Sequence, residues 1–168
     1  MSSDFYATSI VPFAAIIIKI CRAYTNTQAD FEDYYQEVCL QIWRSHGTFD
    51  ERAAWSTWTY RVSLNVCMTL LKTHNRNRRT FASDVVPPEL VEDSRAFADE
   101  SLNQLYDAIR QLSEVDRAVI LLYLDEKSYS EIGEIIGTNP NNVGVRINRI
   151  KDRLRRLLDE KDNRSDVA

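Results

Sequence analysis

The side chains best suited to contact a ligand lie in the last predicted helix, PNNVGVRINRIKDRLRRLL, which begins at Pro140. Its apolar residues recur at helical spacing and form one stripe, so the remaining residues point outward. Asparagine amides and arginine guanidinium groups bond base edges and phosphates in a DNA major groove. The alternative is a solvated face on a structural helix. The outward set is Asn141, Asn142, Val145, Asn148 and Arg149, flanked by Arg146 and Arg153.

The residues before this helix predict a helix-turn-helix. Ser128 and Glu131 have capping-box spacing and start a short helix, which Gly137 can end with a positive φ. Asn139 can then cap the next helix, with proline at its first position. Gly144 costs about 1 kcal/mol of helix stability relative to alanine. It weakens the predicted recognition helix without ending it.

A second group combines aromatic and basic residues. Trp55, Trp58 and Tyr60 stand at the start of a helical stretch that carries Arg61. Aromatic rings beside cations suit single-stranded or melted DNA, because unstacked bases need π-surfaces and the backbone needs positive charge. The alternative is that these aromatic residues are core residues. The stretch ends in a basic cluster, formed by Lys72, Arg76, Arg78 and Arg79.

Other helices must position these groups. A helical apolar stripe runs from Phe31 to Trp43, and no strand candidate stands out, so we predict an all-α fold. The apolar segment Ile10–Ile20 is expected to be a buried first helix and not a membrane-spanning one. A helix that crosses a bilayer takes about 20 apolar residues, and Lys19 interrupts this shorter segment. The expected layout is two small helical domains, 1–80 and 101–160, joined by a flexible acidic linker, 81–100, and followed by a tail, 161–168. Pro87-Pro88 forbids a regular helix in the linker.

Composition narrows the function. The 168 residues carry a net charge of −4, which gives no general attraction to nucleic acid. Three cysteines without C-x-x-C spacing predict reduced thiols in a cytoplasmic protein. Zinc binding by these cysteines with His46 and His74 lacks ligand-like spacing. No nucleophile motif or Gly-rich phosphate loop is present, so we expect no enzyme activity, cofactor, metal or small-molecule substrate.

Four motifs in order resemble one known family, the extracytoplasmic-function (ECF) sigma factors of bacterial RNA polymerase. DYYQEVCLQIW resembles the family's D-x-x-Q-E-V-F-L-x-x-W, and WSTWTYRVSLN resembles F-x-T-W-L-Y-R-I-x-x-N. LSEVDRAVILLYL and SYSEIGEIIG resemble L-x-x-x-x-R-x-V-x-x-L-x-Y and S-Y-x-E-I-A-x-x-L-G. The resemblance covers residues 10 to 158. It implies a region 2-like bundle, a region 4-like helix-turn-helix domain, and a role in promoter recognition, melting and initiation.

The resemblance also implies site residues and partners. The partners would be core RNA polymerase, promoter DNA and an anti-sigma factor around which the two domains clamp, with no direct membrane insertion. The polar face of the first motif would grip the polymerase clamp helices through Asp33, Gln36, Glu37 and Gln41. The minus-ten element would be held by Phe49, Asp50, Arg52, Trp58, Tyr60, Arg61 and Asn65. The minus-thirty-five element would be read by Asn141, Asn142, Arg146 and Arg149.

The chain departs from the family at two places. Where paired arginines often follow the asparagine helix, this chain has Leu71-Lys72, and Thr69 stands for the usual aspartate. The recognition helix commonly reads Thr-Val-Lys-Ser, and here it reads Asn-Val-Gly-Val over 142–145. The missing lysine and the new valine argue against the family's usual upstream phosphate contact, and Val145 can instead touch a thymine methyl group.

The negative net charge of the chain suits a sigma factor, because the polymerase would supply most of the basic surface that holds the DNA. We expect the linker, with Glu89, Glu92 and Asp93, to thread a basic polymerase channel as a mimic of nucleic acid. Two alternatives remain open at this level. A free-standing helix-turn-helix regulator would bind duplex DNA without polymerase and with steep salt dependence. A sigma-like protein-interaction module would not need Arg146 and Arg149.

Overall fold

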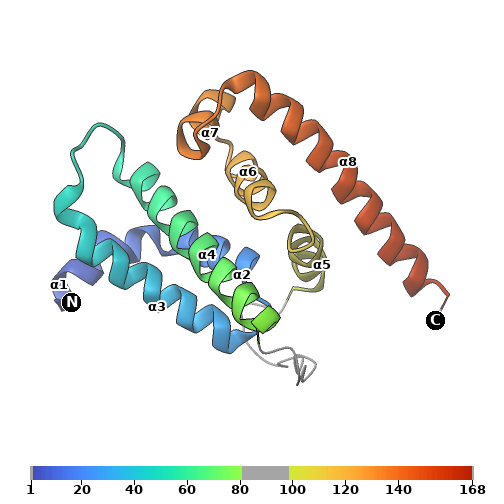
Figure 1. Ribbon diagram of the computed structural model, residues 1–168, viewed down its shortest axis with the longest axis horizontal. Coiled ribbons are helices and arrows are strands. Elements are labelled where there is room, and N and C mark those ends of the chain that lie inside the picture. The colour runs from blue at the N-terminus through green and yellow to red at the C-terminus, as the bar shows by residue number, and fades with distance from the viewer. Residues whose placement is uncertain (1, 81–98, 168) are drawn as a thin grey trace. The chain divides into compact units, whose positions relative to one another are not determined.

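The computed structural model describes residues 2–80 and 99–167, which form two compact units, 1–92 and 93–168 (Figure 1). Every regular element within the described residues is helical, so the all-α prediction is confirmed. The predicted linker falls almost wholly on residues 81–98, and the expectations for Pro87-Pro88, Glu89, Glu92 and Asp93 therefore lie outside the described residues. The predicted domain limits at 80 and 101 stay predictions.

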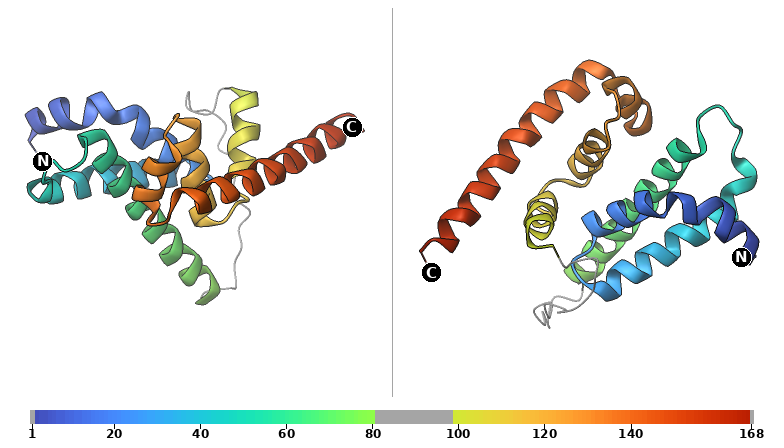
Figure 2. Two further views of the ribbon diagram at one scale, coloured as in Figure 1. Left: turned by 90° about the horizontal axis from the view of Figure 1, so that it is seen from above. Right: turned by 180° about the vertical axis from the view of Figure 1, so that it is seen from behind.

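The first unit is built on three helices, α2 (Ala14–Tyr24), α3 (Gln28–Ser45) and α4 (Trp55–Thr80). Both α2 and α3 lie along α4 and also contact each other (Figure 2). Thr27 caps α3, since its hydroxyl accepts a hydrogen bond from the Asp30 amide at 3.1 Å. The stripe predicted for this helix is buried at Phe31, Val38 and Ile42, which fixes the opposite face outward.

The N-terminal segment is longer than its apolar core suggested. Short turns, α1 (Ser3–Phe5), η1 (Tyr6–Ile10) and η2 (Val11–Phe13), precede α2 and make one helical stretch, Ser3–Tyr24. By length and composition alone this stretch could cross a membrane, so the estimate that it is too short was wrong. Its second half is nevertheless a core helix, because Ile17 and Ile20 are buried. The prediction of a buried first helix is confirmed for that half.

All three cysteines lie in the core of the first unit. Cys21 on α2 and Cys67 on α4 approach with their sulfur atoms 3.9 Å apart. The hydrogen bond with Cys21, together with burial, raises the pKa of Cys67, and burial raises the pKa of Cys39 to about 11. The thiols of Cys39 and Cys67 are therefore protonated at neutral pH, and the buried cysteines act as small apolar packing groups.

The second unit holds α5 (Glu100–Ile109), α6 (Glu114–Leu124), α7 (Tyr129–Ile136) and α8 (Pro140–Ser165). Polar side chains accept hydrogen bonds from the first turn of every one of these helices. The core is apolar and includes Ile109, Leu122, Ile132, Ile147 and Ile150. α8 continues through residues 161–165 of the predicted tail, where Lys161 pairs with Asp107 of α5 at 2.9 Å.

The turn between α7 and α8 has the predicted helix-turn-helix form. Gly137 adopts φ +86°, a left-handed conformation that ends α7. The amides of Gly137 and Thr138 both donate to the carbonyl of Gly133, at 2.8 and 2.9 Å. A Cβ atom on Gly133 would lie 2.5 Å from the Thr138 carbonyl oxygen, so this close turn requires glycine there.

Candidate polymerase and nucleic-acid interface

The outward face of α3 carries the four residues predicted to bind polymerase. Asp33 and Gln36 are exposed, while Glu37 and Gln41 are half-buried toward α4. The Glu37 carboxylate lies 3.8 Å from the Arg44 guanidinium, an exposed pair that holds neither side chain firmly. The helix thus presents carboxylates and amides on one continuous side.

An aromatic cluster, Phe49, Trp55 and Trp58, anchors the loop between α3 and α4. The Trp55 ring centre lies 4.7 Å from that of Trp58 and 5.0 Å from that of Phe49. The Trp55 indole N–H also donates to the carbonyl of Ser9 at 2.9 Å, which ties the cluster to the N-terminal segment. Contacts within the protein therefore fix the position of this end of the loop.

The tip of this loop is polar and exposed. Arg52 pairs with Asp50 at 3.0 Å, and its amide donates to the same carboxylate at 3.2 Å. Glu51 between them has φ +61°, which is uncommon for a residue with a side chain. The short η3 turn (His46–Thr48) precedes the loop. Asp50 and Arg52 therefore stand on a tightly turned, solvent-facing segment.

The four predicted minus-ten residues on α4 do not share one environment. Asn65 is exposed, and Trp58 and Arg61 are half-buried. Tyr60 is only 2% exposed and lies in the core. The structure thus leaves Trp58, Arg61 and Asn65 accessible to a ligand, and gives Tyr60 a packing position.

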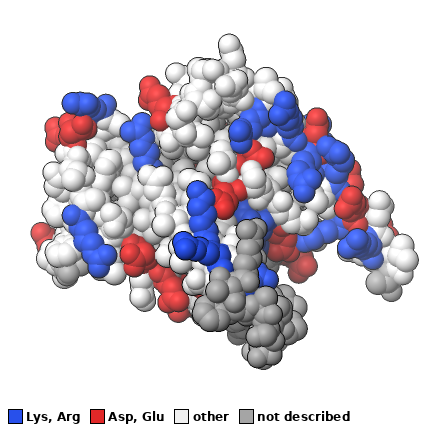
Figure 3. Space-filling model, viewed as in Figure 1, with Lys and Arg blue, Asp and Glu red and all other residues white. Residues whose placement is uncertain are grey.

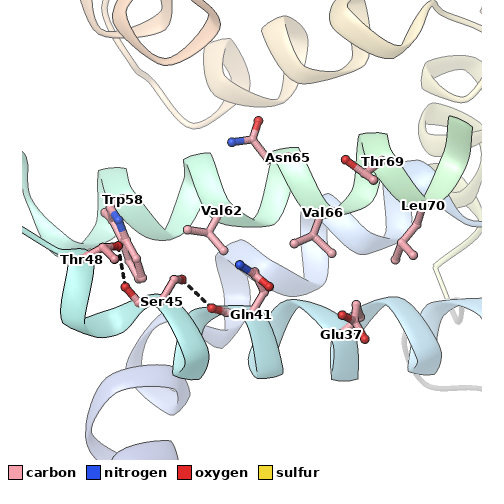
Figure 4. A pocket seen from close by; sticks show the side chains of 10 residues that line it. All are labelled: Glu37, Gln41, Ser45, Thr48, Trp58, Val62, Asn65, Val66, Thr69 and Leu70. Atoms are coloured by element: carbon pink, nitrogen blue, oxygen red, sulfur yellow. Dashed lines mark hydrogen bonds between the residues drawn. The ribbon is translucent and has the colours of Figure 1, made fainter.

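A groove of about 440 Å³ runs between α3 and α4 (Figure 4). Glu37 and Gln41 line its α3 wall, and Trp58 and Asn65 line its α4 wall. Val62 and Val66 add apolar surface between these polar groups. Two pairs of residues predicted to bind different partners therefore border the same groove.

The outward face of α8 has a neutral side and a cationic side. At 100° per residue, Asn141, Val145 and Asn148 fall on the neutral side, and all three are exposed. Asn142, Arg146, Arg149 and Arg153 fall on the cationic side and are exposed as well. Figure 3 shows lysine and arginine side chains gathered along α8.

Two residues outside the predicted site, Asp116 and Tyr129, contact α8 on its flanks. Asp116 at the start of α6 accepts a hydrogen bond from the Arg146 guanidinium at 2.8 Å. Tyr129 at the start of α7 lies against the backbone of Gly144. Asp116 is 30 residues away from Arg146 in the sequence, so local sequence patterns do not predict this pairing. The unusual glycine at 144 in α8 was the one sequence feature that pointed to a close neighbour such as Tyr129.

The start of α7 is held by the predicted capping box. The Ser128 hydroxyl accepts from the Glu131 amide at 3.1 Å, and the Ser128 amide donates to the Glu131 carboxylate at 2.7 Å. The hydrogen bond from the Ser128 backbone lowers the pKa of Glu131 below its usual value, because it stabilises the charged form. This cap fixes the first turn of α7, on which Tyr129 stands.

Comparison with known families matches both units. The family described as "Sigma-70 region 2" matches residues 12–77, and "Sigma-70, region 4" matches residues 102–154. The chain is similar to the RNA polymerase sigma factor CarQ of Myxococcus xanthus, with 31% identity over 77% of this chain and 75% of CarQ. It is also similar to the ECF RNA polymerase sigma factor SigW of Bacillus subtilis, with 26% identity over 92% of this chain and 89% of SigW.

Solved structures show the same fold. The sigma factor RpoE from Bartonella quintana, in complex with the anti-sigma factor NepR, superposes with a TM-score of 0.75 at 18% identity, over 94% of this chain and 98% of that one. CnrH, in complex with the cytosolic domain of CnrY, gives a TM-score of 0.67 at 18% identity, over 95% and 90% of the two chains. The expected resemblance is thus confirmed: the chain belongs to the ECF sigma factors of the sigma-70 family, which direct transcription initiation by RNA polymerase.

Proposed function

We propose that core-polymerase docking and minus-ten strand binding meet at the groove between α3 and α4. The observation that carries this proposal is the lining of the groove, with Glu37 and Gln41 on one wall and Trp58 and Asn65 on the other. A melted strand held on α4 would then lie beside the polymerase surface docked on α3. Such an arrangement couples the assembly of the holoenzyme to promoter opening.

Polymerase docking is assigned to the outward face of α3. Asp33 and Gln36 are free to reach a partner, and Glu37 and Gln41 extend the same polar surface toward α4. A face of carboxylates and amides favours a partner helix that offers cations and hydrogen-bond donors. Charge complementarity of this kind sets partner choice and association rate more than raw affinity.

Minus-ten binding is assigned to the loop tip and to the accessible residues of α4. Extracting a base from the duplex costs a few kcal/mol, and a preformed site must offset that cost. The Phe49–Trp55–Trp58 cluster supports such a site, because the rings are already packed against one another. Direct contacts are proposed for Asp50, Arg52, Trp58, Arg61 and Asn65, with Phe49 as a support and Tyr60 as a packing residue.

Minus-thirty-five binding is assigned to α8, where Asn141, Asn142 and Arg149 are exposed on the outward face. Arg146 belongs to the same surface and is oriented by its contact with Asp116. We propose no catalytic chemistry for this chain, and we place it in the cytoplasm, in keeping with three buried thiols. An anti-sigma factor is proposed as its regulator, supported by the RpoE structure with NepR.

The decisive experiment separates polymerase binding from promoter opening. Wild-type protein should co-elute with bacterial core polymerase on gel filtration and give sequence-selective transcripts from a promoter library. Trp58→Ala should lower open-complex formation about tenfold or more, since base stacking is worth about 1–3 kcal/mol per base. Its affinity for core polymerase should change much less.

Two variants act as controls. Trp58→Phe keeps an aromatic ring and should retain most of the opening activity. Thr73→Ala alters an exposed residue of α4 that does not line the groove, and it should leave opening unchanged. Equal losses of core binding and opening in Trp58→Ala would show that Trp58 serves packing, and the groove proposal would fail.

A further inference from the structure

The flank of α8 at Gly144 is occupied by a tyrosine from the neighbouring helix. A Cβ atom built on Gly144 would lie 3.2 Å from Cε2 and 3.6 Å from Cδ2 of Tyr129. The first distance is tighter than an ordinary van der Waals contact. Glycine therefore allows the Tyr129 ring to lie against the helix backbone, in the place that any longer side chain at 144 would take.

Tyr129 is held in this position but remains open to solvent. It is the first residue of α7, directly after the Ser128 capping box that fixes this turn. Even so, 41% of the residue is exposed, a large fraction for an aromatic residue packed against a helix. An exposed ring on this flank is available to a ligand that approaches α8.

Val145 is the second exposed apolar residue of the same surface. It is 53% exposed and follows Gly144 in the chain, in the middle of the outward face. Asn141 and Asn148 lie on the same neutral side, and none of these residues carries a charge. An amide-and-apolar surface of this kind matches A·T pairs in the major groove, where thymine presents its 5-methyl group.

We propose that Tyr129 and Val145 contact thymine 5-methyl groups of the minus-thirty-five element, and that Gly144 is the residue that admits Tyr129 to this surface. Tyr129 is thus a specificity-determining residue, contributed by α7 to the surface of α8. Phosphate anchoring comes from the cationic side of α8, with Arg149 and Arg153. The inference relies on the proposed assignment of α8 to minus-thirty-five binding.

The test removes single methyl groups from the DNA. Holoenzyme is assembled from core polymerase and the full chain, and a promoter selected from the library is synthesised with deoxyuridine for thymidine at one minus-thirty-five position at a time. Uracil keeps the Watson–Crick edge and loses only the methyl group. Wild-type affinity should fall about fourfold at one or two positions.

The variants assign each methyl group to a side chain. Val145→Ala and Tyr129→Ala should each bind thymine and uracil equally at one sensitive position. Tyr129→Phe should keep the wild-type discrimination, because the ring and not the hydroxyl makes the contact. Gly144→Lys should displace the ring, reduce the discrimination at the Tyr129 position, and steepen the salt dependence of binding. Leu124→Ala removes another exposed apolar side chain of the same unit and should leave all ratios unchanged.

Contrary results separate this inference from the function on which it relies. If wild-type holoenzyme needs the minus-thirty-five sequence but binds thymine and uracil equally throughout, the methyl contact is refuted and the assignment of α8 stands. If Tyr129→Phe loses as much as Tyr129→Ala, the hydroxyl contacts the DNA and the proposal is wrong for Tyr129. If transcription does not depend on the minus-thirty-five sequence at all, both proposals fail.

Discussion

The helices α3 and α8 are built alike on their buried sides and differ on their outward sides. Each has a cap at its start and an apolar stripe in the core of its own unit. α3 carries four carboxylates and one arginine. α8 carries eight lysines and arginines, six of them before Leu157, where only one carboxylate opposes them.

This contrast explains how an acidic chain can bind DNA. The net charge of −4 is a sum over surfaces of opposite charge, to which different partners are assigned above. Electrostatic attraction acts locally, since charges farther apart than about 10 Å are largely screened at 0.1 M salt. The proposed contacts of the α8 cations with DNA and of the α3 carboxylates with polymerase are therefore compatible with a negative net charge.

Charge reversal on α3 should have the largest effect. In the double variant Asp33→Arg, Glu37→Arg, we expect the affinity for core polymerase to fall about 30-fold or more. The reason is that the lost charge pairs and the new repulsion each cost about 1 kcal/mol or more at an interface. Titration of core polymerase with fluorescently labelled protein measures the dissociation constant. The proposed promoter contacts of α8 are not altered by this change.

Two other charge reversals test whether position or total charge matters. Glu32→Arg alters an exposed carboxylate of the same helix, about 100° around the axis from Asp33, and should weaken core binding far less. Arg149→Glu should leave core binding intact and abolish dependence on the minus-thirty-five element. If Glu32→Arg weakens core binding as much as the single variant Asp33→Arg does, the overall charge of α3 determines the affinity and the position of each carboxylate does not.

Local signals predicted most of both helices. The stripe from Phe31 to Trp43 has helical period. The structure buries Phe31, Val38, Cys39 and Ile42, leaves the two tyrosines between them half-buried, and exposes Trp43 at the end. The capping box at Ser128, the turn at Gly137 and the cap at Asn139 are each encoded within four residues of the place where they act. Interactions within one helical turn join residues that are close in the chain, so a single sequence is enough to find them.

Contacts between distant segments were not predictable in this way. The Trp55 indole reaches the carbonyl of Ser9, 46 residues earlier, and Arg146 reaches Asp116 across 30 residues. Tyr60 and Trp58 lie two residues apart in one aromatic run, and only the packing of the first unit makes Tyr60 a core residue. Such contacts depend on how helices pack, which periodicity does not specify.

A substitution in α7, where the helix packs against the α7–α8 turn, should have an intermediate effect. We expect Gly133→Ala to lower the free energy of unfolding of that unit by about 1–3 kcal/mol, because its Cβ atom would overlap the backbone at Thr138. All three tryptophans, Trp43, Trp55 and Trp58, lie in the first unit. Urea unfolding followed by circular dichroism should therefore show the loss, while tryptophan fluorescence should keep its wild-type midpoint.

Gly47→Ala is the matched control in the first unit. A Cβ atom there meets nothing within 4 Å, and the glycine does not have a positive φ. Its midpoint should shift little by either signal. A Gly133→Ala protein with unchanged circular dichroism would mean that the α7–α8 turn relaxes freely, contrary to the close approach described above.

The smallest expected effect comes from the capping box, and it depends on pH. Ser128→Ala should cost about 1 kcal/mol, a shift of roughly 4–8 °C in the melting temperature of the second unit.

The folded state lowers the pKa of Glu131, so the stabilisation by its carboxylate is present above the unfolded value of about 4.5 and is lost as the pH falls through the lower folded value. Glu131→Gln removes this titration and keeps a hydrogen-bond acceptor. Thermal melts by circular dichroism from pH 6 downward should therefore show wild type losing more stability than Glu131→Gln below about pH 4.5, and parallel curves would contradict a charged cap.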